Sequence, residues 1–122
     1  MNNQAINFKQ KLSLFHEQCQ PKVIDEMNDY QIKIVKIEGD FEWHSHKETD
    51  ETFIVLDGSL RIDFKEGYVT INAGELYVVK KEIEHKPYAE KEVKMLLIEP
   101  KGVINTGDNE MTARTAINDI WI

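Results

Sequence analysis

The chain has 122 residues, the size of one ordinary domain and too few for two independent cores, so we expect a single domain over 1–122. Hydrophobic residues make up 41% and charged residues 30%, a globular balance that argues against disorder. The net charge of −7 disfavours binding to nucleic acid, because proteins that bind the phosphate backbone concentrate Lys and Arg.

The cysteine count and the apolar runs bear on the compartment. Cys19 is the one cysteine, so an internal disulfide is impossible and nothing requires an oxidising compartment. The start of the chain lacks the basic residues of a signal peptide, and no stretch approaches the ~18 apolar residues that cross a bilayer. We therefore expect a cytoplasmic protein with no membrane partner.

The first predicted element is a short amphipathic helix over 5–18. Ile6, Leu12 and Phe15 recur at roughly helical spacing, and Pro21 ends the pattern. The chain thus begins with an N-terminal helical arm over about 5–20.

From residue 30 the pattern changes to short β-branched runs separated by turn residues. Predicted strands cover 30–39, 42–46, 51–58, 60–67, 68–72, 75–80, 84–89 and 93–100. Strands this close together, without helices between them, predict an all-β antiparallel sandwich or barrel and disfavour a parallel βαβ fold. The barrel core is therefore about 30–100. The tail over 101–122 is expected to wrap back onto it through Ile117, Ile120, Trp121 and Ile122.

Two of these strands differ in their patterning. The strand 60–64 alternates between apolar and polar residues, so one face is core and the other faces water. The run 53–56 is apolar on both faces, and its second face must be covered by another sheet of the chain or by a partner subunit. We favour the partner and expect a homodimer.

Three of the four histidines fall in the β-rich part. His44 and His46 are separated by one residue, so on a strand both imidazoles point to the same face. Glu51 begins the next apolar strand, and His85 opens a later one. This set suits one metal ion with nitrogen and oxygen ligands. Taken separately, a His-x-His pair often arises by chance, and His85 could be an ordinary core histidine. Glu48 and Asp50 are competing carboxylates.

The spacing of these residues resembles the motifs of the cupin superfamily. The first motif is Gly, five residues, His-x-His, three or four residues, Glu, six residues, Gly. This chain reads GDFEWHSHKETDETFIVLDG over 39–58, with one residue fewer after the first Gly. The second motif is matched by Gly74 and His85, whereas Lys80 and Glu82 stand where the motif has Pro and Gly. The turn is altered, but His85 keeps its register.

The resemblance covers roughly 30–100. It implies a double-stranded β-helix, the cupin or jelly-roll barrel, here with a short N-terminal helix. It also implies that one divalent transition metal ion (Fe, Mn, Ni, Co or Zn) is bound by His44, His46, Glu51 and His85. The flanking segments resemble small stand-alone cupins that are often labelled as similar to mannose-6-phosphate isomerase, a likeness of fold that does not establish activity.

Three functions are compatible with this pattern. We favour a metal-dependent isomerase or oxygenase acting on a small polar molecule such as a sugar or a carboxylate. The alternative is a non-catalytic module that binds or senses a small ligand, and the third is a cupin with a vestigial site. The intact ligand set counts against the third. Near the predicted ligands, possible pocket aromatics are Trp43, Phe53, Tyr77 and Tyr88, and Glu99 is a weak candidate for a general base.

Overall fold

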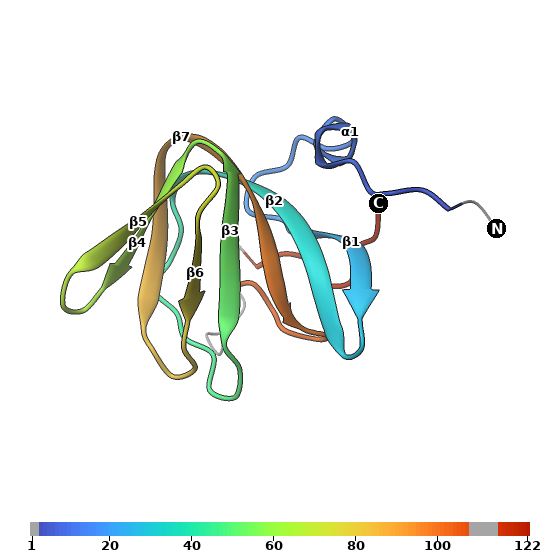
Figure 1. Cartoon of the computed structure of the whole chain (residues 1–122). Helices are drawn as coiled ribbons and strands as arrows, with labels where there is room; N and C mark the ends of the chain where they lie inside the picture. The colour runs from blue at the N-terminus through green and yellow to red at the C-terminus, as the bar shows by residue number, and fades with distance from the viewer. Residues whose placement is uncertain (1–2, 108–114) are drawn as a thin grey trace.

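The computed structural model describes residues 3–107 and 115–122. One helix, α1 (Phe8–Leu12), precedes seven strands (Figure 1). The strands are β1 (Lys22–Met27), β2 (Tyr30–Asp40), β3 (Glu51–Asp57), β4 (Ser59–Phe64), β5 (Tyr68–Asn72), β6 (Leu76–Val79) and β7 (His85–Pro100). All strand pairs between these elements are antiparallel, which confirms the predicted all-β class with one short helix. No helix in the described part of the chain is long and apolar enough to cross a membrane.

Strand β7 organises the sheet. The order of the strands is β1-β2-β7-β3-β6, and β4 joins β7 to β5. The first residues of β7 pair with β4, whereas its second half lies between β2 and β3. The sequence pattern predicts two strands here, 84–89 and 93–100. That division is wrong because the polar stretch between them is a β-bulge, which interrupts the register between Ala89 and Val93 without ending the strand.

The barrel interior is filled by one large cluster of buried apolar side chains. It consists of Val35, Ile37, Phe53, Val55, Leu60, Ile62, Ile71, Val79, Ala89, Val93, Met95 and Leu97. Within each strand, every second side chain points into this cluster, because successive side chains of a strand face opposite sides of the sheet. Three of its members, Val35 on β2, Phe53 on β3 and Leu97 on β7, line the same cavity as the predicted ligand His44.

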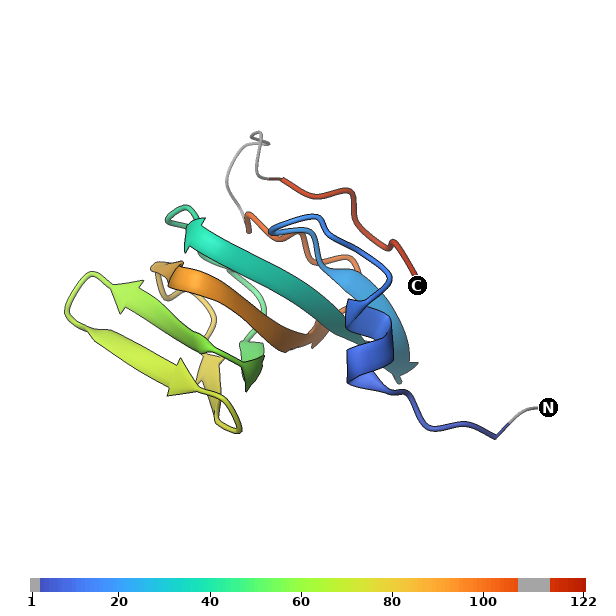
Figure 2. The ribbon, with the colours of Figure 1, turned by 90° about the horizontal axis from the view of Figure 1, so that it is seen from above.

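A second cluster covers the outer face of β2, β3 and β7. Phe15, Ile24, Ile34 and Leu96 are its buried members, and Ile54 and Leu56 pack against it half-buried. Figures 1 and 2 show α1 beside β1 and β2, on the side away from β4 and β5. The second face of the run 53–56 is therefore covered in part by the chain's own terminal segments. The homodimer stays a prediction.

Three further expectations need correction. The helix spans Phe8–Leu12 and not 5–18, because Asn7 caps its start and the turn at Ser13 ends it. Residues 42–46 form no strand, since only His44 makes a β-bridge. Strand β1 lies outside the predicted barrel core, and it pairs with β2 on one side and bridges to Trp121 on the other. The described end of the tail therefore lies along β1.

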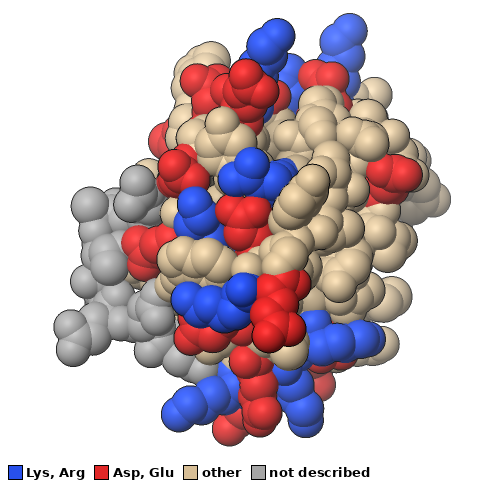
Figure 3. All heavy atoms as spheres, turned by 90° about the vertical axis from the view of Figure 1, so that its left-hand side faces the viewer, with Lys and Arg blue, Asp and Glu red and all other residues tan. Residues whose placement is uncertain are grey.

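The side of the molecule formed by β4 and β5 carries charges of both signs. Figure 3 shows Lys and Arg interspersed with Asp and Glu on this face. Arg61 pairs with Asp63 at 2.7 Å, and Lys86 pairs with Asp40 at 2.6 Å. This face offers no broad surface of one sign.

Candidate metal centre

The four predicted residues come from three separate parts of the chain. His44 and His46 lie in the extended segment after β2, Glu51 begins β3, and His85 begins β7. His44 and His85 form a β-bridge in which each backbone N–H donates to the other carbonyl, at 3.0 and 2.9 Å. This bridge fixes the His-x-His segment against the start of β7.

The structure brings all four side chains to one point in the barrel. One ligand atom from each residue lies within 4.8 Å of the others, and all four residues are buried. Oε1 of Glu51 lies 3.6 Å from Nε2 of His46 and 3.6 Å from Nε2 of His85. Two atoms that are each about 2.1 Å from a shared ion lie roughly 3–4 Å apart, so these separations suit a metal.

The tautomers of two imidazoles are set by backbone carbonyls. Nδ1 of His44 donates to the Glu42 carbonyl, and Nδ1 of His85 donates to the Ile83 carbonyl, both at 2.9 Å. Because a carbonyl only accepts, each Nδ1 carries the proton and each Nε2 presents a lone pair. A metal-binding imidazole needs the same arrangement, with its other nitrogen held by a hydrogen bond.

Three buried atoms at this point lack a hydrogen-bond partner among the described residues. They are Nε2 of His46, Oε1 of Glu51 and Nε2 of His85. Buried polar groups are normally satisfied, so unsatisfied atoms that converge on one point indicate a bound group. The donor set of three imidazoles and one carboxylate fits a divalent transition metal. The role of the four residues as metal ligands stays a prediction.

The electrostatics of the cluster favour neutral imidazole and ionised carboxylate. Burial, followed by the nearby His85, lowers the pKa of His44 to about 4. Burial by itself would raise the pKa of Glu51, but the neighbouring side chains of His46, His85 and Glu99 outweigh it, so that pKa lies well below its usual value. Both groups are therefore held in the protonation state that binds metal.

The competing carboxylates point elsewhere. Oδ1 of Asp50 accepts a hydrogen bond from the Lys81 amide at 2.9 Å, and Glu48 is exposed. Neither belongs to the cluster of four ligand atoms. His16 is likewise exposed, at the end of the N-terminal arm.

The turn before His85 keeps its backbone shape despite the altered residues. Glu82, which stands where the cupin motif has Gly, has a φ of 71°. Its amide donates to the His46 carbonyl at 2.7 Å. The turn therefore holds a non-glycine residue in the left-handed region and ties the two histidine segments together.

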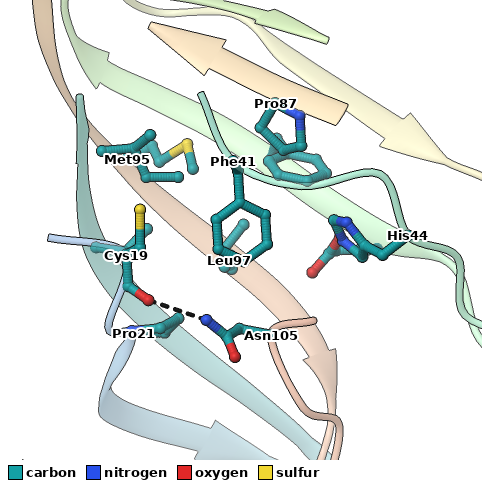
Figure 4. A pocket seen from close by; sticks show the side chains of 12 residues that line it. Cys19, Pro21, Phe41, His44, Pro87, Met95, Leu97 and Asn105 are labelled. Atoms are coloured by element: carbon teal, nitrogen blue, oxygen red, sulfur yellow. Dashed lines mark hydrogen bonds between the residues drawn. The ribbon is translucent and has the colours of Figure 1, made fainter. Parts of the chain in front are cut away.

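A small cavity of about 30 Å³ lies beside His44 and Glu51 (Figure 4). Most of its lining is apolar and comes from β2, β3, β7 and the segment before β1. The lining residues are Cys19, Pro21, Val35, Ile37, Phe41, His44, Glu51, Phe53, Pro87, Met95, Leu97 and Asn105. Asn105 donates to the Cys19 carbonyl at 3.0 Å and thereby joins the two terminal segments across the cavity.

Of the four aromatics considered for a pocket, Phe53 alone lines this cavity. Its ring centroid lies 6.2 Å from that of His85. Tyr77 packs against the main core, whereas Trp43 lies under the Lys65 ammonium and Tyr88 under the Arg61 guanidinium, at 4.0 and 4.5 Å. The last three are therefore packing or surface residues with respect to this cavity.

The sequence reasoning missed two buried polar residues close to the cluster. Lys33 is buried and donates to Glu99 Oε1 at 2.8 Å, and Gln31 is fully buried. Glu99, the weak candidate for a general base, thus has Lys33 as its partner. Gln31 and Lys33 alternate with Ile32 and Ile34, a pattern that predicts polar residues facing solvent, so the sequence carried no signal for their burial.

Comparison with protein families gives one match, to the family described as "Cupin domain", over residues 32–99. This region is more than half of the chain. Among solved structures, a cupin-2 domain containing protein from Shewanella frigidimarina is 54% identical, with a TM-score of 0.78, over 79% of this chain and 94% of that one. These matches confirm the jelly-roll fold.

Two other similarities are more limited. An uncharacterised protein of Bacillus subtilis, YdbB, is 36% identical over 64 residues, which are 52% of this chain. The match spans 57% of that relative's length. The hydroquinone 1,2-dioxygenase PnpCD, solved with Cd²⁺ and 4-hydroxybenzonitrile, is 18% identical with a TM-score of 0.67, over 79% of this chain and 72% of that one. At this identity the likeness is one of fold.

Proposed function

The chain belongs to the cupin domain family, and we propose that it is a metal-dependent enzyme whose ion is bound by His44, His46, Glu51 and His85. The observation that supports this most is the convergence of unsatisfied buried atoms from His46, Glu51 and His85. Of the reactions that the sequence leaves open, we favour a dioxygenase.

The ligand set decides which ions are candidates. Three neutral imidazoles and one carboxylate suit Fe(II), Mn(II), Ni(II), Co(II) or Zn(II). When bound, the ion would polarise an oxygen group of the substrate and, if it is iron, would activate dioxygen. The protein's part is to hold Glu51 ionised, to keep the Nε2 lone pairs directed at one point, and to bury the site away from bulk water.

The lining of the cavity bears on the substrate. Apolar side chains surround the space beside His44 and Glu51, and the lining contains no Lys or Arg within the described residues. A phosphosugar would therefore have no side-chain cation there, which counts against an isomerase of the mannose-6-phosphate type. The chemistry of this lining better suits a small molecule with one metal-binding oxygen group and an apolar part, such as a phenol or a short carboxylate, for which the cavity of about 30 Å³ must widen.

A dioxygenase reaction fits this assignment without a further reactant. Both atoms of one dioxygen molecule enter the product, so the substrate supplies all the electrons and no external reductant is needed. The distant fold neighbour with hydroquinone 1,2-dioxygenase activity shows that a related barrel can support such chemistry in another protein.

The test begins with tag-free protein reconstituted anaerobically with each candidate metal. Mass spectrometry should find about one ion per chain in the wild type and in His16→Ala, whose side chain is exposed, and almost none in His85→Ala. The iron-loaded protein should then consume dioxygen in the presence of a responsive small phenol or carboxylate. Bound metal without turnover on the panel would favour the ligand-binding alternative, and absence of metal would refute the proposal.

We also propose that the protein is a homodimer. On the outer face of the sheet Leu76 is 60% exposed and pairs in register with the half-buried Ile54. A second copy would cover this apolar face. Light scattering should give twice the 14.2 kDa mass of one chain, and Leu76→Lys should shift the particle toward the monomer. A wild-type monomer would refute this proposal.

A further inference from the structure

A row of buried polar side chains crosses the sheet next to the metal cluster. Gln31 on β2 is the register partner of Glu99 on β7, and the pairing of Thr52 with Ile98 places Glu51 beside Glu99. Gln31, Glu51 and Glu99 are 0%, 3% and 1% exposed. Polar groups buried this deeply must be satisfied by one another or by a bound group.

Lys33 lies against this row and is the cation that faces it. Its ammonium donates to Oε1 of Glu99 at 2.8 Å, and the two side chains are 3% and 1% exposed. Glu99 is the one carboxylate within ion-pairing distance of Lys33 in the described part of the chain. The buried Lys33–Glu99 pair therefore lies immediately beside a carboxylate assigned to the metal.

The C-terminal segment prevents Lys33 from turning toward solvent. The ammonium also approaches the Val103 carbonyl at 3.3 Å and Oδ1 of Asn118 at 3.4 Å. At the far end of the row, Gln31 donates to Asp119 at 2.8 Å. The positive charge is thus fixed inside the protein, where an unpaired charge would be strongly destabilising.

The proximity of Glu51 and Glu99 is electrostatically significant. Burial and then the charge of Glu51 raise the pKa of Glu99 well above its usual value, although Lys33 opposes that shift. If Glu99 were absent, the Lys33 ammonium would be unpaired, and the neighbouring carboxylate would be Glu51. An ammonium attracted to Glu51 would compete with a metal ion for the same oxygens.

We infer that Glu99 is a positioning residue: by binding the Lys33 ammonium, it keeps the Glu51 carboxylate available to the metal ion. The inference rests on the proposed metal site and adds to it a pair of residues that contact no metal. Since Lys33 is the competitor, removal of Lys33 should make Glu99 dispensable.

A double-mutant cycle tests whether the need for Glu99 depends on Lys33, with Co(II) as the probe. Affinity is measured by competition with a chelator, and the visible spectrum of the bound Co(II) reports whether Glu51 remains in its environment. Glu99→Gln, which keeps the shape and replaces the carboxylate that binds the Lys33 ammonium, should weaken Co(II) binding by about tenfold or more. Lys33→Met should bind Co(II) at least as tightly as the wild type. Lys33→Met/Glu99→Gln should recover most of the lost affinity and the wild-type spectrum.

The outcomes separate the inference from the metal site on which it rests. If the pair matters only for packing, the double variant will bind Co(II) as weakly as Glu99→Gln or more weakly, and the inference is overturned. If Glu99→Gln does not fold, the double variant decides alone, since a loss above about tenfold would refute the inference. Wild-type protein that binds no Co(II) would overturn the metal site as well.

Discussion

Oε1 of Glu51 and Nε2 of His85 face each other at 3.6 Å inside the barrel. The proton of His85 is on Nδ1, which donates to a backbone carbonyl, so the two facing atoms are both acceptors. Two acceptors directed at each other in a buried place repel unless a cation lies between them. This contact therefore makes metal binding a matter of stability as well as of activity.

Metal should accordingly stabilise the fold. At free metal one hundred times its dissociation constant, the free energy of unfolding should rise by about 2.7 kcal/mol. Thermal melts with and without Co(II) measure this as an increase in Tm of several degrees. His85→Ala should fold, because the apolar clusters supply the core, and should show no increase. His16→Ala should respond like the wild type, and a His85→Ala protein that does so would contradict the ligand assignment.

The metal-free protein should lose stability in mild acid because of His44. Its pKa is about 4 in the folded protein and near 6.5 when unfolded, so the unfolded chain takes up the proton first as the pH falls. The loss of stability is absent above about pH 6.5, grows as the pH falls from 6.5 to 4, and reaches roughly 3 kcal/mol at the lower end. Urea unfolding with a chelator present should show a smaller loss over this range for His44→Phe. Equal losses would contradict this interpretation.

Glu82→Gly should stabilise the protein, although glycine usually destabilises. Glu82 has a φ of 71°, a conformation that costs a non-glycine residue about 1–2 kcal/mol, while glycine loses more entropy on folding. We expect a net gain of up to about 1 kcal/mol in urea unfolding. Lys81→Gly, one residue earlier and without a positive φ, is the matched control and should lower stability. A loss for both variants would show that the Glu82 backbone is not strained.

Gly107→Ala should disturb the metal centre from outside. A methyl group there would meet the Ser45 carbonyl, and it would come within 3.2 Å of His44 Cδ2. We expect a loss of about 1–3 kcal/mol in stability, together with weaker Co(II) binding. Gly102→Ala is the control, because Gly102 also has a positive φ but has open space around its Cα. Equal effects on Co(II) binding would mean that the contact with His44 is unimportant.

The sequence indicated the four clustered residues because their spacing is a local property. His44 and His46 share a face in any extended segment, even though this one is not a strand. The place of Glu51 and His85 beside them follows from the motif spacing. By contrast, β1 contains only two adjacent apolar residues, Val23 and Ile24, and becomes a strand through its pairing with β2. Such pairing has no local signal.

The pairing of Lys33 with Glu99 was also beyond the reach of the sequence. The two residues are 66 positions apart, and a lysine on a strand normally faces solvent. Only the register of β2 against β7 turns Lys33 inward and places it diagonally across from Glu99. The same limit applies to the cavity, whose lining combines segments from both ends of the chain.

The bulge in β7 has a consequence for how this chain tolerates insertions and deletions. Between Ile37 and Gly39 the strand β2 advances two residues, while its partner advances four, from Val93 to Ala89. Strand β7 therefore has two more residues than β2 at the bulge. Because this number is even, His85 at one end of β7 and Glu99 near the other both point inward. Loss of a single residue from 90–92 would leave one extra residue in β7 instead of two. The side chains at one end of the strand would then turn outward. Evolution can therefore lengthen or shorten this stretch by two residues. Insertion or deletion of one residue would instead turn His85 away from the interior into which Glu99 points.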